Sequence, residues 1–197
     1  MQGLEKFKEY MSGFRSHYVV IGGLATVLTL EDRAFPAQIE LFSKVPEYVE
    51  VLEDVHIVHI PMEGYTSSFS AIIMDEAYYD FAIEHSEIVG DIRILKPEAL
   101  IVLKAVAYNE NLRRKEAGAN VDQRDIDKHK KDVYRLAYVF DGSERFEVNE
   151  TIKAQMKAFI SEVEKSPIDG KNMFRGKGIP AMGTEEFTEL LRGMFGV

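Results

Sequence analysis

Cysteine is missing from all 197 residues of this sequence. Its absence excludes disulfide bonds and metal sites that are built from thiolates. No run of apolar residues approaches the roughly 18 that a membrane-spanning helix needs. The N-terminal segment Met1–Lys6 also lacks the basic stretch followed by an apolar stretch that marks a secretory signal. These absences predict a cytoplasmic protein that has no membrane partner.

Positive charge is also scarce in this sequence. Its 24 Lys and Arg residues are outnumbered by 33 Asp and Glu residues, so the formal net charge is −9. An acidic surface repels nucleic acid at long range, so contact with a polynucleotide requires a local basic patch. Residues 113–115 and 128–131 form two short basic clusters, although clusters of this length are more often solvated helix faces. A nucleotide substrate stays compatible with the charge, because bound magnesium supplies positive charge.

The order of strand and helix patterns predicts an α/β domain at residues 1–95 and a helical domain at residues 96–197. Near the N-terminus, Tyr18–Ile21 is a short apolar run with β-branched residues, typical of a buried strand. Gly22 and Gly23 interrupt this run, and a helical pattern follows. A strand, a glycine turn and a helix in this order are the parts of a phosphate-facing unit.

The remaining elements follow from the hydrophobic periodicity. Strands are predicted at residues 39–42 and 55–60, a β-hairpin at 86–95, and either a strand or the start of a helix at 69–74. Helices are predicted at 75–83, from Pro97 to a stop at Gly118, from about 123 to 140, at 151–163 and at 185–194, with a loop over 165–183. The predicted fold class is therefore α/β, with a mixed sheet and a helical C-terminal half.

Several pieces of the sequence resemble one known family in the order in which they occur. They are residues 17–26 (HYVVIGGLAT), 39–43 (IELFS), 103–105 (LKA), and 124–136, which begins RDI and ends KDVYRL. In this order they resemble the AbiEii-like (abortive-infection, type IV toxin–antitoxin) nucleotidyltransferases, from about residue 15 to residue 140. The resemblance implies a nucleotidyltransferase-like mixed sheet.

The resemblance also implies an activity. It implies transfer of a nucleotide from a nucleoside triphosphate to an RNA end or a protein hydroxyl, with magnesium as cofactor and a cognate antitoxin as partner of the toxin. Polymerase-type transfer needs a glycine turn for the triphosphate, an Asp-x-Asp pair on a strand and a third carboxylate to hold two metal ions. The absence of a strong basic groove favours an RNA end over a long nucleic-acid footprint.

Five residues take roles from this resemblance. Gly22 and Gly23 would contact the phosphates, and Glu40 would supply the carboxylate of the third strand to the metal. Lys104 would neutralise phosphate charge, and Asp125 would be the polar partner from the helical half. The predicted catalytic residues are thus Glu40, Lys104 and Asp125.

The sequence departs from the family at the metal-binding pair. The family carries an Asp-x-Asp strand between the Gly-Gly helix and the strand that ends in Glu-Leu-Phe-Ser, but here Arg33 is almost directly followed by Pro36. Two explanations stay open: the deletion is real and the chain is a degenerate relative, or a segment is absent from this sequence. We favour the second, because loss of a central strand would uncover its neighbours in a protein stabilised by only about 5–15 kcal/mol.

Each predicted site residue also has a reading without a ligand. Gly22-Gly23 could be a tight turn, and Glu40 could be an exposed residue alternating with apolar ones. Lys104 could extend its ammonium group to solvent, and Asp125 could be a first-turn residue favoured by the helix dipole. The alternatives to an enzyme are therefore a catalytically degenerate relative that acts as a binding or regulatory module, and an unrelated α/β protein.

Overall fold

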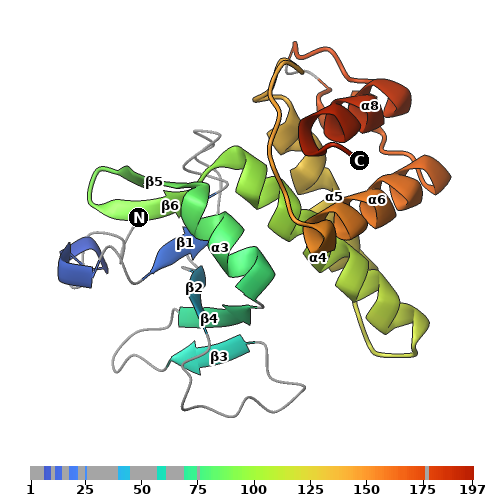
Figure 1. Ribbon diagram of the computed structural model, residues 1–197. Helices are drawn as coiled ribbons and strands as arrows, with labels where there is room; N and C mark the ends of the chain where they lie inside the picture. Colours follow the sequence, from blue (N-terminus) through green and yellow to red (C-terminus); the bar gives the residue numbers. More distant parts are fainter. Residues whose placement is uncertain are drawn as a thin grey trace. The chain divides into compact units, whose positions relative to one another are not determined.

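The computed structural model describes residues 7–9, 12–14, 18–21, 25, 40–44, 57–60, 69–74, 76–175 and 178–197. The chain divides into two compact units, residues 1–100 and residues 101–197, and each unit is described by itself. The division falls inside helix α4 (Pro97–Glu116), a few residues after the boundary predicted at position 95 (Figure 1).

The first unit contains a six-stranded mixed sheet with the strand order β3-β4-β2-β1-β6-β5. The strands are β1 (Val19–Ile21), β2 (Glu40–Lys44), β3 (Ile57–Ile60), β4 (Phe69–Met74), β5 (Ser86–Val89) and β6 (Ile92–Leu95). Parallel pairs join β1 to β6 and β2 to β4, and the other pairs are antiparallel. The prediction of an α/β fold with a mixed sheet is confirmed, and residues 69–74, for which two readings were open, form a strand.

Strand β1 is buried in the interior of this sheet. Val19 and Val20 have no exposed surface, as expected for a β-branched run covered on both faces. On one side β1 pairs with β2, in a register that sets Ile21 opposite Glu40, and on the other side it pairs with β6. Strand β2 likewise has β1 and β4 as neighbours. Hydrogen-bonded strands thus flank both β1 and β2.

The hairpin of β5 and β6 turns where the sequence predicted. Gly90 adopts a φ of 62°, a left-handed conformation that glycine reaches without steric cost. The pairing sets Val89 opposite Ile92 on the two sides of the turn. This hairpin forms one end of the sheet order, next to β1.

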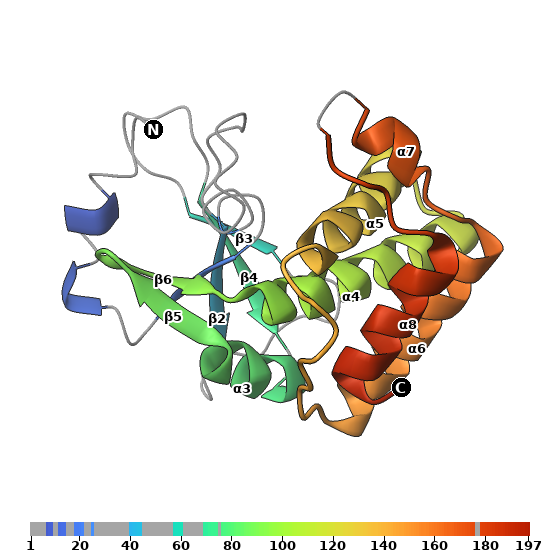
Figure 2. The same cartoon turned by 90° about the horizontal axis from the view of Figure 1, so that it is seen from above.

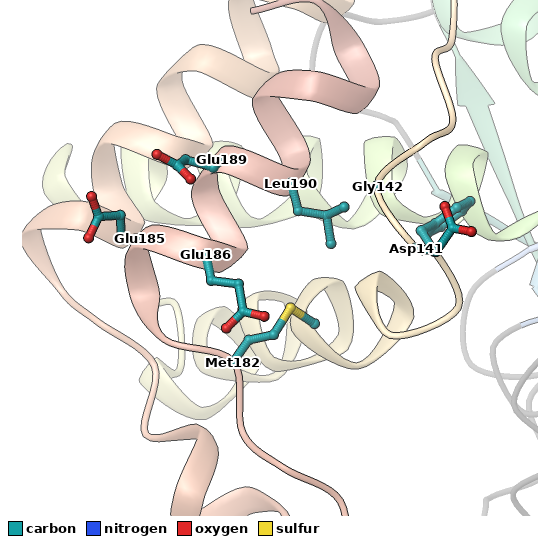
Figure 3. Close-up of a pocket in the computed structure, with 8 residues that line it drawn as sticks. Asp141, Gly142, Met182, Glu185, Glu186, Glu189 and Leu190 are labelled. Carbon is teal, nitrogen blue, oxygen red and sulfur yellow. The ribbon is translucent and has the colours of Figure 1, made fainter.

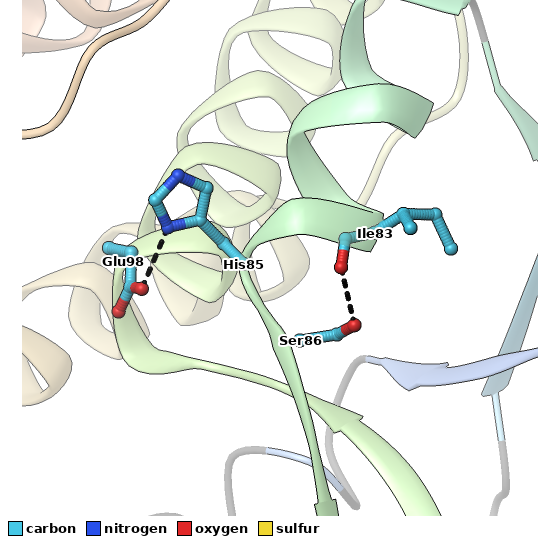
Figure 4. Close-up of polar contacts among 4 residues, drawn as sticks. All are labelled: Ile83, His85, Ser86 and Glu98. Atoms are coloured by element: carbon cyan, nitrogen blue, oxygen red, sulfur yellow. Dashed lines mark hydrogen bonds and ion pairs between the residues drawn. The ribbon is translucent and has the colours of Figure 1, made fainter.

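A polar contact joins helix α3 (Glu76–Glu84) to the first turn of α4 within the first unit. His85 Nδ1 lies 2.9 Å from Glu98 Oε1. The centroids of the Phe81 and His85 rings are 4.2 Å apart. The Ser86 hydroxyl donates to the carbonyl of Ile83 at 2.7 Å (Figure 4). The contact between His85 and Glu98 holds the residue that follows α3 against the first turn of α4. Glu98 is almost completely buried, so little water competes for this contact.

The second unit is helical, as predicted. Besides α4 it contains α5 (Gln123–Ala137), α6 (Glu150–Lys165), α7 (Gly170–Met173) and α8 (Thr184–Phe195). Helices α6 and α8 lie side by side (Figure 2). Phe159, Phe187 and Phe195 are buried in this unit. Part of the predicted loop over 165–183 is the single helical turn α7. None of the helices within the described residues is long and apolar enough to span a membrane.

Side chains cap the N-termini of two helices of the second unit, α5 and α6. Asp122 accepts a hydrogen bond from the backbone of Arg124 at the start of α5, and Asn149 accepts one from the backbone of Ile152 at the start of α6. Side-chain oxygens at this position satisfy amide groups that have no partner inside the helix. These caps fix where α5 begins, and therefore which α5 residues point towards α4.

Candidate functional site: a buried polar cluster on α4 and α5

Lys104 lies on the buried face of α4, between residues that have no exposed surface. It is 6% exposed, while Ile101 and Ala105 beside it are completely buried. Its Nζ atom lies 3.0 Å from Oδ2 of Asp132 on α5. The alternative in which Lys104 extends to solvent is therefore wrong, because its ammonium group is held inside the unit by a carboxylate.

Asp132 connects two cations. It is 5% exposed, and its second oxygen, Oδ1, lies 3.5 Å from Nη1 of Arg135, one helical turn further along α5. The Arg135 side chain is 36% exposed, so this cation reaches the surface. Two cations share one carboxylate, and the three side chains together therefore hold one excess positive charge.

His129 lies one turn before Asp132 on α5. Its Nδ1 atom is buried and has no hydrogen-bond partner within the part of the chain that the structure describes. The pKa of His129 is lowered to about 4, mainly by burial and also by the nearby charges of Lys104 and Lys128, against the opposite effect of Asp132 and Asp125. The imidazole is thus neutral near pH 7, so His129 adds no charge to the cluster.

Asp125 was predicted to be the polar partner from the helical half. It is exposed in the first turn of α5, where a carboxylate is stabilised by the helix dipole. The carboxylate that meets Lys104 is Asp132, seven residues later and on the same side of the helix. Sequence reasoning missed Asp132, although a lysine on a buried face requires a carboxylate on the facing helix. The catalytic role of Asp125 stays a prediction.

The predicted residues of the first unit are only partly described. Glu40 begins β2, and the β1–β2 register sets its backbone opposite Ile21, the residue that precedes Gly22. The side chain of Glu40, and both Gly22 and Gly23, lie outside the described residues. Strand pairing thus brings the predicted carboxylate position to the end of β1 that leads into the glycine pair.

The metal site expected from the resemblance stays a prediction. It needs an Asp-x-Asp pair on one strand and a third carboxylate, for which the resemblance offers Glu40. The sequence between Gly23 and Glu40 carries no Asp-x-Asp pair. Among the described residues, no three His, Asp or Glu side chains come together to hold a metal ion. No chemical step is therefore assigned to magnesium.

A groove of about 480 Å³ lies in the second unit, between α8 and the segment that follows α5 (Figure 3). Its lining residues are Phe140, Asp141, Gly142, Met182, Glu185, Glu186, Glu189 and Leu190. Four of these side chains are carboxylates, which repel the phosphates of a nucleotide. Neither Lys104 nor Asp125, the predicted site residues of this unit, lines the groove.

Comparison with known proteins adds little to this description. No family model matches the chain. No curated protein matches it either. The solved structures include JHP933 from Helicobacter pylori, which is similar over 96% of this chain and 86% of that chain, at 14% identity and a TM-score of 0.42. Similarity at this level supports no inference about function.

Proposed function

We propose that this chain is a nucleotidyltransferase-like protein that binds a nucleoside triphosphate and passes a nucleotide to an RNA end or a protein hydroxyl. Within that proposal it is the toxin of a toxin–antitoxin pair, as the resemblance implies. The observation on which the proposal rests is the Lys104–Asp132–Arg135 cluster, at a lysine that the resemblance assigns to phosphate. Its excess positive charge suits a phosphate group, because ionised partners form the stronger hydrogen bonds.

The burial of Lys104 supports this reading. A buried ion pair is often no more stabilising than well-packed apolar residues of the same size. Helix α4 could therefore hold a leucine or methionine at position 104, facing an apolar residue on α5, without loss of stability. A charge retained there, beside the surface-reaching Arg135, is consistent with a role for the charge itself.

Nucleotide binding is the first test. A fluorescent nucleoside triphosphate is titrated into the protein with and without magnesium, and the dissociation constant is compared with that of Lys104→Gln. Loss of one charge-assisted hydrogen bond, worth about 1.5–3 kcal/mol, should weaken binding roughly 10- to 100-fold. Lys153→Gln, which removes an ion-paired lysine from α6, is the charge control and should bind like the wild type. Thermal melts followed by circular dichroism check that both variants are folded under the assay conditions, since Lys104→Gln breaks a buried ion pair. Equal affinity of Lys104→Gln and wild type would refute the role given to Lys104.

A second candidate function is favoured by one specific observation. Strands β1 and β2 each have a hydrogen-bonded neighbour on both sides, although the sequence between Gly23 and Glu40 carries no Asp-x-Asp pair. These facts fit a catalytically degenerate relative that binds a partner or nucleotide without transferring it. Such a protein should show no incorporation of an α-labelled nucleotide into RNA or protein at any magnesium concentration.

Magnesium dependence separates the two functions. If the wild type transfers nucleotides, its binding of the nucleoside triphosphate and its incorporation of labelled nucleotide should both depend on magnesium. If the chain is a degenerate relative, nucleotide binding should be the same with and without magnesium. An intact mass of the purified protein above 22.4 kDa would show that the natural chain carries a further segment.

A further inference from the structure

Four cations form a row along the outer side of α5. Arg124, Lys128, Lys131 and Arg135 are spaced by four, three and four residues, which places them on one side of a helix. The first three are exposed, and Arg135 is 36% exposed. The apolar residues of α5, such as Val133, lie on the opposite side and are buried. We call these four residues the α5 cation row.

The row differs from the ion-paired cations of α6 and α8. On α6, Lys153 and Lys165 form ion pairs with glutamates one turn away, and on α8 Arg192 pairs with Glu164. In contrast, within the described residues no ion pair involves the side chains of Arg124, Lys128 or Lys131. The chain has a net charge of −9, so three exposed cations in line without carboxylate partners make a local positive surface.

The structure also separates the row from the rest of the basic cluster at 128–131. Lys130 points inward, where Nζ donates to the carbonyl of Ser166 at 3.0 Å and lies 5.7 Å from the centre of the Tyr108 ring. The imidazole of His129 is partly buried and neutral, for the reasons stated for the polar cluster. These two residues thus face the interior, and the other two residues of the cluster belong to the row.

Two carboxylates border the row. By helical spacing, Asp125 lies on one side of it and Asp127 on the other. The four cations extend over roughly 16 Å, since each residue of a helix rises about 1.5 Å. The α5 cation row is a single line of positive charges with a carboxylate on each side. Such a surface fits the phosphates of one nucleic-acid strand better than those of the two strands of a duplex.

We infer that the α5 cation row is a docking surface for the phosphate backbone of single-stranded RNA. The choice of RNA rests on the proposed function, whereas the polyanion itself follows from the row. Regular spacing along a line matches a polymer with one charge per residue, and bidentate arginines at both ends suit phosphate.

A binding assay with a matched control tests this inference. The probe is a fluorescent single-stranded RNA of about 16 nucleotides, without triphosphate or metal, titrated between roughly 50 and 200 mM salt. The test variant is the triple Arg124→Gln, Lys128→Gln, Lys131→Gln. The control is the triple Lys153→Gln, Lys157→Gln, Lys165→Gln on α6. Each triple removes three positive charges, so both have a net charge of −12 (−9 minus 3).

The expected result is a difference between two proteins of equal charge. The α5 triple should bind RNA at least about tenfold more weakly at the lowest salt, and its salt slope should fall by about 2, or roughly 0.7 for each lost phosphate contact. The α6 triple should bind as the wild type does. Thermal melts followed by circular dichroism check that both triples are folded, since exposed charges contribute little to stability.

Three outcomes would overturn the inference. The first is a wild-type protein that does not bind the RNA at low salt, and the second is an equal loss in both triples. The third is tighter binding to a poly-glutamate peptide than to RNA, which would assign the row to an acidic protein partner. The α5 triple leaves Lys104, Asp132 and Arg135 in place, so it should bind the nucleoside triphosphate as the wild type does, and failure of nucleotide binding and failure of RNA docking are separate results.

Discussion

Lys104 on α4 and Asp132 on α5 hold an ammonium nitrogen and a carboxylate oxygen 3.0 Å apart, with both side chains almost completely buried. The contact joins the two helices through charge, in a unit whose buried residues are mainly apolar. Removing one partner of a buried pair leaves the other charge without compensation, while removing both does not. This asymmetry makes the pair open to a direct test.

Breaking the pair from one side should destabilise the protein strongly. We expect Lys104→Met or Asp132→Leu to lower the free energy of unfolding by about 3–5 kcal/mol, because each leaves a buried, uncompensated charge. The double variant should recover most of that loss, since it replaces the pair with apolar side chains. Urea unfolding of the four proteins measures this, and a double variant as unstable as the sum of the singles would contradict it.

The largely buried imidazole of His129 predicts a pH dependence of stability. Its pKa is about 4 in the folded protein, mainly because of burial, against about 6.5 when unfolded. Between these values the unfolded chain binds a proton that the folded chain does not. Stability is therefore fully present above pH 6.5 and is lost as the pH falls towards 4, by up to roughly 3 kcal/mol.

His129→Leu should remove this dependence. Leucine does not titrate, and the Nδ1 atom that it replaces has no hydrogen bond to lose among the described residues. Urea unfolding from pH 7 to pH 4.5 should therefore show a steeper loss of stability in the wild type than in the variant. Carboxylates contribute equally to both proteins, so parallel curves would mean that His129 is not held neutral in the fold.

Gly170 packs against Tyr134, whose ring is held in place by a hydrogen bond of its hydroxyl. A methyl group at this position would lie 2.8 Å from Cζ of Tyr134, whose hydroxyl donates to the carbonyl of Met182 at 2.7 Å. We expect Gly170→Ala to lower the free energy of unfolding by about 1–3 kcal/mol through overpacking. Thermal unfolding followed by circular dichroism measures the change.

Gly193→Ala is the matched control for that substitution. Gly193 lies within α8, and an added methyl group would meet the Arg145 guanidinium at an ordinary 3.6 Å. Alanine is the better helix former by up to about 1 kcal/mol, so this variant should be more stable than the wild type. Equal effects of the two alanines would show that Tyr134 does not limit the space at Gly170.

The hydroxyl of Tyr138 anchors the segment before α8. It accepts a hydrogen bond from the backbone of Met182 at 2.7 Å and lies 3.0 Å from the carbonyl of Pro180. Tyr138→Phe should cost about 1–3 kcal/mol, because the Met182 amide loses its acceptor. Tyr108→Phe is the control, since no hydrogen bond of its hydroxyl is found within the described residues. Limited proteolysis after Pro180 should be faster in Tyr138→Phe only.

Much of the local structure was predictable from the sequence because it depends on neighbouring residues. The β-branched run before Gly22 predicts β1. Gly90 predicts the hairpin turn because glycine adopts a positive φ without steric cost, and its φ in the structure is positive. Asp122 caps α5 by accepting a hydrogen bond from the backbone of Arg124, only two residues further along the chain. The alignment of the α5 cation row follows in the same way from helical spacing alone.

Other features depend on packing between segments far apart in the chain. Asp125 and Asp132 are seven residues apart on one side of α5, so their spacing does not decide which of them meets Lys104. The packing of α4 against α5 selects Asp132, because it leaves Asp125 at the exposed end of the helix. The pairing of β1 with β2 likewise depends on hydrogen bonds across a long sequence separation.

The sequence by itself therefore determined most of the elements, their order and the charge on each helix face, since these follow from the local period of the chain, but it left residues 69–74 open and did not predict α7. Only the tertiary structure decided that Lys104 is buried beside Asp132, that Lys130 points inward, and that β1 and β2 are direct neighbours. The physical reason is that burial and pairing are set by contacts between distant segments, which a local period does not encode.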